Sequence, residues 1–129
     1  MNESDIEGRY ADLFGMVPEN VKERVDLAKA SGREEALEII EQLRDTLIHH
    51  NPLERKIQQL VHLGMLLALG REEPARLHAQ AALQAGATKA ELHGVCETAA
   101  IVGGMPAYSL GVHVCSLVLA EETGEPSHD

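Results

Sequence analysis

The sequence has very few aromatic residues and a large excess of negative charge. Tryptophan is absent, and Tyr10, Phe14 and Tyr108 are the only aromatic residues among 129. Proteins that bind single-stranded nucleic acid stack its bases on aromatic side chains, which this chain cannot supply in number. The formal net charge of -10 also opposes binding to nucleic acid or to an anionic membrane surface. We therefore expect neither as a partner.

Cysteine is also scarce. Cys96 and Cys115 are too far apart to form a CxxC unit. The residues from Met1 to Glu7 have neither the basic nor the apolar region of an export signal. We therefore expect a cytoplasmic protein, in which both cysteines are reduced packing residues.

One long stretch has no charged residue. No Asp, Glu, Lys or Arg occurs from Ala99 to Ala120, but Gly103, Gly104 and Pro106 divide the stretch into halves too short to cross a membrane. Two short apolar helices need cover on more than one side. The pattern therefore predicts a buried position or a subunit interface, and with it a homo-oligomer.

Helix signals cover the whole chain, and no strand alternation stands out. Ser4 and Glu7 are spaced as a capping box, and so are Thr88 and Glu91. Together with the turn residues, these signals predict an all-α fold of about seven helices. The first predicted helix begins near Ser4, and the second and third span about 18–32 and 33–49. The fourth follows the break at 51–52 and ends near Gly70, and the last three span about 72–85, 88–103 and 107–122. We interpret 1–129 as a single domain, with N-terminal packing helices in 1–50, a core in 53–120, and a polar tail from Thr123 that we expect to be frayed.

Two of these helices have a clear apolar face. In the predicted helix 33–49 it consists of Ala36, Ile39, Ile40, Leu43 and Leu47. In the helix that ends near Gly70 it consists of Ile57, Leu60, Val61, Gly64, Leu67 and Ala68. Gly64 costs helix stability, and we expect it to let a neighbouring backbone approach closely.

His78 is the first candidate for chemistry, because imidazole exchanges protons near neutral pH. Its neighbours on the same helix face are all small: Ala75, Ala81, Ala82 and Ala85. Small neighbours leave room either for a substrate or for another helix. From the pattern alone, a core histidine bonded to a carbonyl is the favoured interpretation.

A family resemblance changes that balance. The segments Arg55–Leu63, Pro74–Glu91 and Gly103–Ala107 follow one another in an order and spacing that resemble the carboxymuconolactone decarboxylase family, which includes the AhpD disulfide reductases. The resemblance covers about Leu53 to Leu119. It implies an AhpD-like helical bundle, a homotrimer or homohexamer, and an active-site role for His78.

The chain departs from this family at two places. AhpD-like members relay protons through a glutamate that follows an arginine just before the position of Leu60, where this chain has Gln58 and Gln59. An amide can orient a ligand but cannot act as a base. Disulfide reductases also have a CxxC whose positions are Arg71 and Pro74 here. Thiol exchange needs two thiols, so disulfide reductase or peroxidase activity is not expected.

The remaining hypothesis is a lyase that acts on a small carboxylic acid or lactone. Such a decarboxylase needs a proton donor, for which we predict His78, and a cation or helix N-terminus for the carboxylate. His62 is a second acid or base candidate, although a packing role is equally compatible with its position. We assign Gln59 and Arg71 to substrate binding. Arg55 and Arg76 are further cations, and a solvated surface charge is the alternative for every arginine.

No cofactor or metal is predicted. Facing His62 and His78 side chains would hold a metal only if a carboxylate joined them. The alternative to an enzyme is a non-catalytic oligomer of the same fold, with a binding or structural role. An open pocket with an arginine near His78 would favour the enzyme, whereas a sealed, fully packed ring would favour the non-catalytic oligomer.

Overall fold

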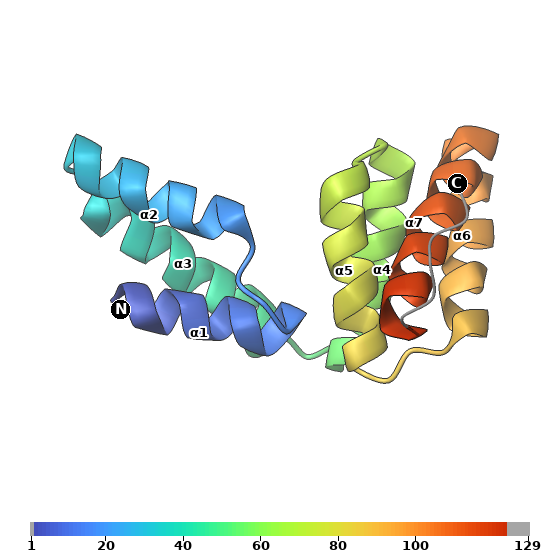
Figure 1. The fold of residues 1–129 in the computed structure, drawn as a ribbon, viewed down its shortest axis with the longest axis horizontal. Coiled ribbons are helices and arrows are strands. Elements are labelled where there is room, and N and C mark those ends of the chain that lie inside the picture. Colours follow the sequence, from blue (N-terminus) through green and yellow to red (C-terminus); the bar gives the residue numbers. More distant parts are fainter. Residues whose placement is uncertain (1, 124–129) are drawn as a thin grey trace. The chain divides into compact units, whose positions relative to one another are not determined.

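The computed structural model describes residues 2–123, which form seven helices and no strand (Figure 1). The helices are α1 Glu3–Phe14, α2 Glu19–Ser31, α3 Glu34–His49, α4 Arg55–Leu69, α5 Glu72–Gln84, α6 Lys89–Gly103 and α7 Met105–Thr123. The predicted all-α fold is confirmed. The tail at 124–129, which we expected to be frayed, lies outside the described residues.

One of the two predicted capping boxes forms. The amide of Glu91 donates to Thr88 Oγ1 at 3.0 Å, and the amide of Thr88 donates to Glu91 Oε1 at 2.9 Å. The box predicted at Ser4 is wrong, because α1 begins earlier and is capped by Asn2. The amide of Asp5 donates to Asn2 Oδ1 at 2.8 Å. Asparagine caps a helix as well as serine does, so Asn2 and Ser4 were both possible caps for this helix.

The chain divides after Leu53 into two compact units. Unit 1 contains α1 to α3, and unit 2 contains α4 to α7. Among residues 2–123, no helix is long and apolar enough to cross a membrane.

Unit 1 has a small apolar core and a buried carboxylate. The buried apolar residues come from α1 and α2: Ile6, Tyr10, Leu13, Phe14, Val21, Val25 and Ala28. Glu41 of α3 is only 4% exposed and accepts a hydrogen bond from the Tyr10 hydroxyl at 3.0 Å. Arg24 lies 3.5 Å from the same carboxylate, and the Arg44 guanidinium covers the Tyr10 ring at 3.9 Å. Opposite charge and hydrogen bonds offset the cost of burying Glu41.

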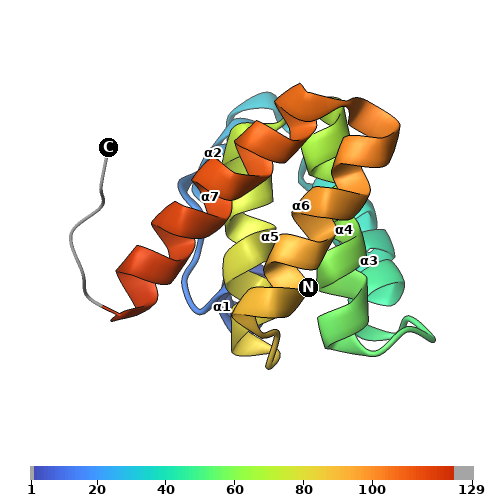
Figure 2. The same ribbon diagram turned by 90° about the vertical axis from the view of Figure 1, so that its right-hand side faces the viewer.

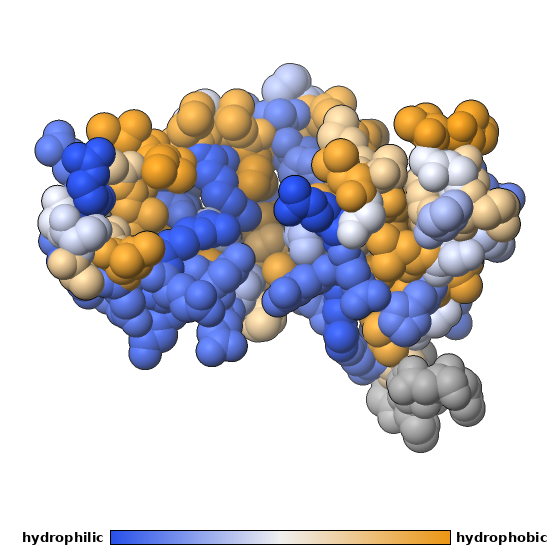
Figure 3. All heavy atoms as spheres, turned by 90° about the horizontal axis from the view of Figure 1, so that it is seen from above, coloured by the Kyte–Doolittle hydropathy of each residue, from blue (hydrophilic) through white to orange (hydrophobic). Residues whose placement is uncertain are grey.

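The apolar face predicted on α3 points away from this core. Ile39, Ile40, Leu43 and Leu47 are each 55–61% exposed. The helix therefore buries its charged face within unit 1 and presents its apolar face at the surface. Apolar side chains reach the surface of both units (Figure 3).

Unit 2 is a four-helix arrangement in which α4 packs against α5 and α6, and α7 packs against α5 and α6 (Figure 2). Its core is built from small and medium apolar side chains, chiefly Leu63, Leu67, Leu92, Cys96, Val114, Val118 and several alanines. The expectation for Gly64 is wrong, because a Cβ added there would meet only the Val95 side chain, at an ordinary 3.5 Å, and no neighbouring backbone. Close approaches occur instead at Gly103, where a Cβ would lie 3.2 Å from the Ala68 Cα, and at Gly111, where it would lie 2.6 Å from Cys96 Sγ.

Candidate active site

Three polar side chains meet between α4 and α5. Gln59 and His62 are three residues apart on α4 and therefore share a helix face. Across from them, His78 of α5 places its Nδ1 2.6 Å from Gln59 Oε1 and 3.3 Å from His62 Nδ1. The two imidazole rings meet edge to face, with centroids 4.7 Å apart. We call these three residues the histidine cluster.

Small residues on α5 allow this close packing. Ala75, Ala79 and Ala82 are all fully buried in the core of unit 2. The sequence left open whether the alanines near His78 make room for a substrate or for another helix. Beside Ala75 and Ala82, side chains of the unit 2 core fill this space.

The cluster has a fully buried end and a partly exposed end. Gln59 is 0% exposed, and its Nε2 has no hydrogen-bond partner. His62 and His78 are both half-buried, so solvent reaches part of each side chain. An unpaired buried amide group costs about 1–3 kcal/mol, which calls for an explanation in a native core. The bond to His78 involves only the Gln59 oxygen and therefore holds the buried amide in place while leaving its Nε2 unpaired.

This geometry selects one tautomer of His78. An amide oxygen can only accept, so His78 Nδ1 carries the proton that is donated to Gln59 Oε1. The neutral ring then has its lone pair on Nε2, the atom that can take up a further proton. His62 Nδ1 faces the same proton from the other side. The cluster can therefore hold a proton and pass it on.

The candidate arginines lie in different settings. Arg71 is exposed and immediately precedes α5, seven residues before His78, which is about 10 Å along the helix axis. Glu72 and Glu73 occupy the first turn of the same helix and weaken its attraction for an anion. Arg76 is paired with Glu121. The exposed Arg71 therefore remains the better candidate of these two, at some distance from the ring.

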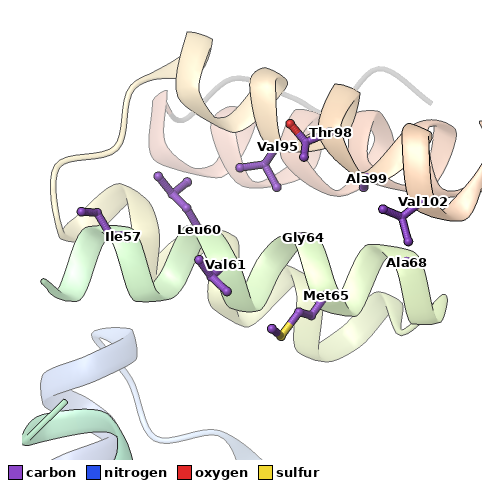
Figure 4. A pocket seen from close by; sticks show the side chains of 10 residues that line it. All are labelled: Ile57, Leu60, Val61, Gly64, Met65, Ala68, Val95, Thr98, Ala99 and Val102. Atoms are coloured by element: carbon purple, nitrogen blue, oxygen red, sulfur yellow. The ribbon is translucent and has the colours of Figure 1, made fainter. Parts of the chain in front are cut away.

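A separate apolar hollow of about 450 Å³ lies between α4 and α6 (Figure 4). It is lined by Ile57, Leu60, Val61, Gly64, Met65, Ala68, Val95, Thr98, Ala99 and Val102. Neither histidine of the cluster lines it, because Gln59 and His62 lie on another face of α4. With Thr98 as the one polar side chain among these lining residues, the hollow suits an apolar group rather than a carboxylate.

No group of three histidine, cysteine or acidic side chains is placed to hold a metal ion within the described part of the chain. The facing pair of His62 and His78, which we considered as a partial metal site, has Gln59 beside it instead of a carboxylate. In this arrangement the three side chains bond to one another.

Comparison with known proteins agrees with the resemblance. The carboxymuconolactone decarboxylase family matches residues 34–114, well over half of the chain. The chain belongs to this family. The match begins on α3, earlier than the core that we expected from Leu53.

One curated member of the family can be compared in detail. The 4-carboxymuconolactone decarboxylase of Acinetobacter baylyi (strain ATCC 33305 / BD413 / ADP1) is 35% identical over 69 residues. The aligned part covers 54% of this chain and 52% of that protein, so the match spans about half of each. No solved structure matches the chain.

Proposed function

We propose that this chain is a cofactor-independent lyase that decarboxylates a small carboxylic acid or lactone in the cytoplasm. The observation that carries the proposal is the histidine cluster, in which His78, His62 and Gln59 are bonded together in a member of a decarboxylase family. His78 is the general acid or base, and His62 is its partner. No metal is needed for this chemistry.

The reaction assigns a definite task to His78. Loss of CO2 breaks a carbon–carbon bond and leaves the electron pair on the substrate as a carbanion or enolate. A proton must then be delivered to that carbon, and positioned acids of this kind contribute about 10²- to 10⁴-fold in rate. Because Nδ1 is bonded to Gln59, Nε2 is the nitrogen that takes up a proton and donates it to the substrate. His62 shares the charge of the protonated ring.

Gln59 is better assigned to positioning His78 than to binding substrate. It is fully buried, and its oxygen already accepts from His78 Nδ1. It occupies the position at which the family resemblance implies a relay glutamate. In this chain the amide keeps the orienting hydrogen bond and gives up the negative charge. Arg71, exposed at the start of α5, is the remaining candidate to attract the substrate carboxylate.

The first test measures CO2 release from 4-carboxymuconolactone, the compound named in the relative from Acinetobacter baylyi. We expect turnover by the unmodified chain and a loss of about 10²-fold or more in His78→Ala. His93→Ala is the matched control, because His93 is exposed on α6 and bonds Tyr108 instead. Equal loss in both variants would remove His78 from the mechanism.

A second pair of variants tests the role of Gln59. Gln59→Glu should move the pH dependence of turnover, because it places a negative charge beside the His78 ring. Gln59→Leu should lower turnover while leaving the substrate KM nearly unchanged, since the residue does not touch substrate. A rise in KM alone would restore Gln59 to substrate binding.

A non-catalytic oligomer with a binding or structural role is the alternative. It is favoured by the absence of a carboxylate in the histidine cluster, because Gln59 cannot relay a proton. This alternative predicts no CO2 release from any small acid or lactone, together with thermal stabilisation by ligands that is unchanged in His78→Ala. The same set of measurements therefore distinguishes the two hypotheses.

We also propose that the chain forms a homotrimer or homohexamer through the apolar face of α4 and α6. Met65 is 60% exposed and Val102 is 82% exposed on this face, a large apolar exposure for a chain of 14.0 kDa. Light scattering at micromolar concentration should give a multiple of that mass. Met65→Asp and Val102→Asp should shift it toward the monomer, whereas Ser116→Asp on the exposed side of α7 should not. A monomer in the unmodified chain would refute the proposal.

A further inference from the structure

The two cysteines lie side by side, although 19 residues separate them in the sequence. Cys96 of α6 and Cys115 of α7 have their sulfur atoms 3.8 Å apart, and neither forms a disulfide. They are 0% and 6% exposed, respectively. The sequence indicated two unrelated packing residues, and the packing of α6 against α7 brings them together. Neither takes part in the histidine cluster.

Gly111 makes this contact close. It lies four residues before Cys115 and therefore on the same face of α7. A side chain at this position would place its Cβ 2.6 Å from Cys96 Sγ and 2.8 Å from Leu67 Cδ1. The absence of a side chain lets α7 approach α6 at the level of the two thiols. A disulfide needs its sulfur atoms about 2.05 Å apart, so the two sulfur atoms, now 3.8 Å apart, must move closer by about 1.8 Å.

The two thiols are chemically unequal. The hydrogen bond from Cys115 lowers the pKa of Cys96, because it stabilises the thiolate. The same hydrogen bond, followed by burial, raises the pKa of Cys115. On this basis we assign Cys96 as the attacking sulfur and Cys115 as the sulfur that resolves the product, and the variants below test this order.

We propose that Cys96 and Cys115 are an oxidation site, which a hydroperoxide converts to a reversible disulfide between α6 and α7. The Cys96 thiolate attacks the peroxide, the oxygen–oxygen bond breaks, and an alcohol or water leaves as Cys96 becomes a sulfenic acid. Cys115 sulfur then attacks Cys96 sulfur, and the hydroxyl leaves as water with the Cys115 proton. Two thiols are oxidised, one peroxide is reduced, and an external dithiol returns the pair to its reduced form.

The test treats the purified full chain with hydrogen peroxide and then counts free thiols after denaturation. Both thiols should be lost together, the chain should lose two hydrogen atoms in mass without joining a second chain, and dithiothreitol should restore both thiols. In Cys115→Ser, Cys96 should stop at a sulfenic acid that dimedone traps. In Cys96→Ser, the Cys115 thiol should remain largely unreacted. Circular dichroism of each variant establishes that its helices are retained.

Two results would overturn the proposal: both thiols surviving the treatment in the folded chain, or each cysteine being oxidised separately to a sulfinic acid. Gly111→Ala sharpens the test, because a side chain that pushes α7 from α6 should slow disulfide formation relative to Gly94→Ala, whose new methyl group meets no atom within 4 Å. The site is not the CxxC site of the disulfide reductases, whose positions are Arg71 and Pro74 here. The expectation of no peroxidase activity concerned that site alone, and any turnover of peroxide with a dithiol should here depend on Cys96 and Cys115. Without a dithiol, each chain should consume one equivalent of peroxide and then stop.

Discussion

The two units differ in the kinds of side chain that they bury. Unit 1 buries a carboxylate, Glu41, and leaves the apolar face of α3 at the surface. Unit 2 fills its core with alanine, leucine, valine and cysteine, and its buried polar groups include the Gln59 amide that bonds His78. The buried polar group therefore makes a different kind of contact in each unit. In unit 1 it ties three helices together, and in unit 2 it bonds the ring of a histidine on the neighbouring helix.

Both units nevertheless leave apolar surface uncovered. Leu43 of α3 and Met65 of α4 are each about 60% exposed, although each lies in a clear apolar pattern. Surfaces of this kind mark interaction sites in soluble proteins. In unit 2 the exposed apolar side chains line a hollow, whereas in unit 1 they lie along one face of α3, and the hollow of unit 1 has mainly polar lining residues.

The largest expected effect tests the tight packing of unit 2. Gly111→Ala should lower the free energy of unfolding by about 1–3 kcal/mol, because its methyl group would overlap Cys96 and Leu67. Gly94→Ala is the matched control on the neighbouring helix. It should raise stability by about 0.5–1 kcal/mol, since nothing lies within 4 Å of the added methyl group. Urea unfolding followed by circular dichroism measures both, and equal effects would show that α6 and α7 are not tightly packed.

The second prediction tests the polar core of unit 1. Glu41→Ala should cost about 1–3 kcal/mol, because the Tyr10 hydroxyl loses its acceptor and the nearby arginines lose their buried counter-charge. Gln42→Ala, at the next and exposed position, should change stability by less than about 0.5 kcal/mol. Urea unfolding at neutral pH measures both. If Glu41→Ala is as stable as its control, the buried carboxylate contributes nothing to unit 1.

The third prediction concerns alkaline pH and again affects unit 1. Burial raises the pKa of Tyr10 above its usual value of 10.0, despite the opposing effect of Arg44 and Arg24. A pKa raised by folding gives stability that is complete below the unfolded value and is lost as pH rises through the folded value. The chain should therefore lose stability above about pH 10, and part of that loss should be absent in Tyr10→Phe. Urea midpoints from about pH 9 to pH 11 measure it, and parallel curves would contradict the assignment.

Much of the helical architecture could be predicted from sequence because its signals are local. Thr88 and Glu91 form the predicted box, and the glycines at 32 and 70 adopt the positive φ that ends α2 and α4. The predicted candidates His62, His78 and Gln59 also proved to be neighbours, since spacing on α4 and the family resemblance both pointed to α4 and α5.

Contacts between helices for which the family resemblance gave no indication could not be predicted, because they depend on which faces meet. The pairing of Cys96 with Cys115 follows from the crossing of α6 and α7, and no spacing rule in the chain indicates it. The exposure of the apolar face of α3 could not be predicted either. An amphipathic pattern shows that one face of a helix tends to be buried, but it does not identify the element that buries it. The burial of Gln59 was also not predicted, and the positioning role that we propose for this residue depends on it.

The smallest expected effect compares the capping boxes of the two units. Glu91 has a pKa below its usual value, mainly because the Thr88 amide donates to it and also because Lys56 lies 3.2 Å away. A pKa lowered by folding gives stability that is present above the unfolded value and is lost as pH falls. Glu91→Gln keeps a capping side chain but removes the charge, so it should lower the urea midpoint slightly at neutral pH and not at all below about pH 4. Glu97→Gln, exposed further along the same helix, is the control and should leave the midpoint unchanged at both pH values.

Asp5→Asn makes the same exchange in the capping box that Asn2 forms in unit 1. A larger shift of the urea midpoint in Asp5→Asn than in Glu91→Gln would mean that the charge of the capping box contributes more to stability in unit 1 than in unit 2.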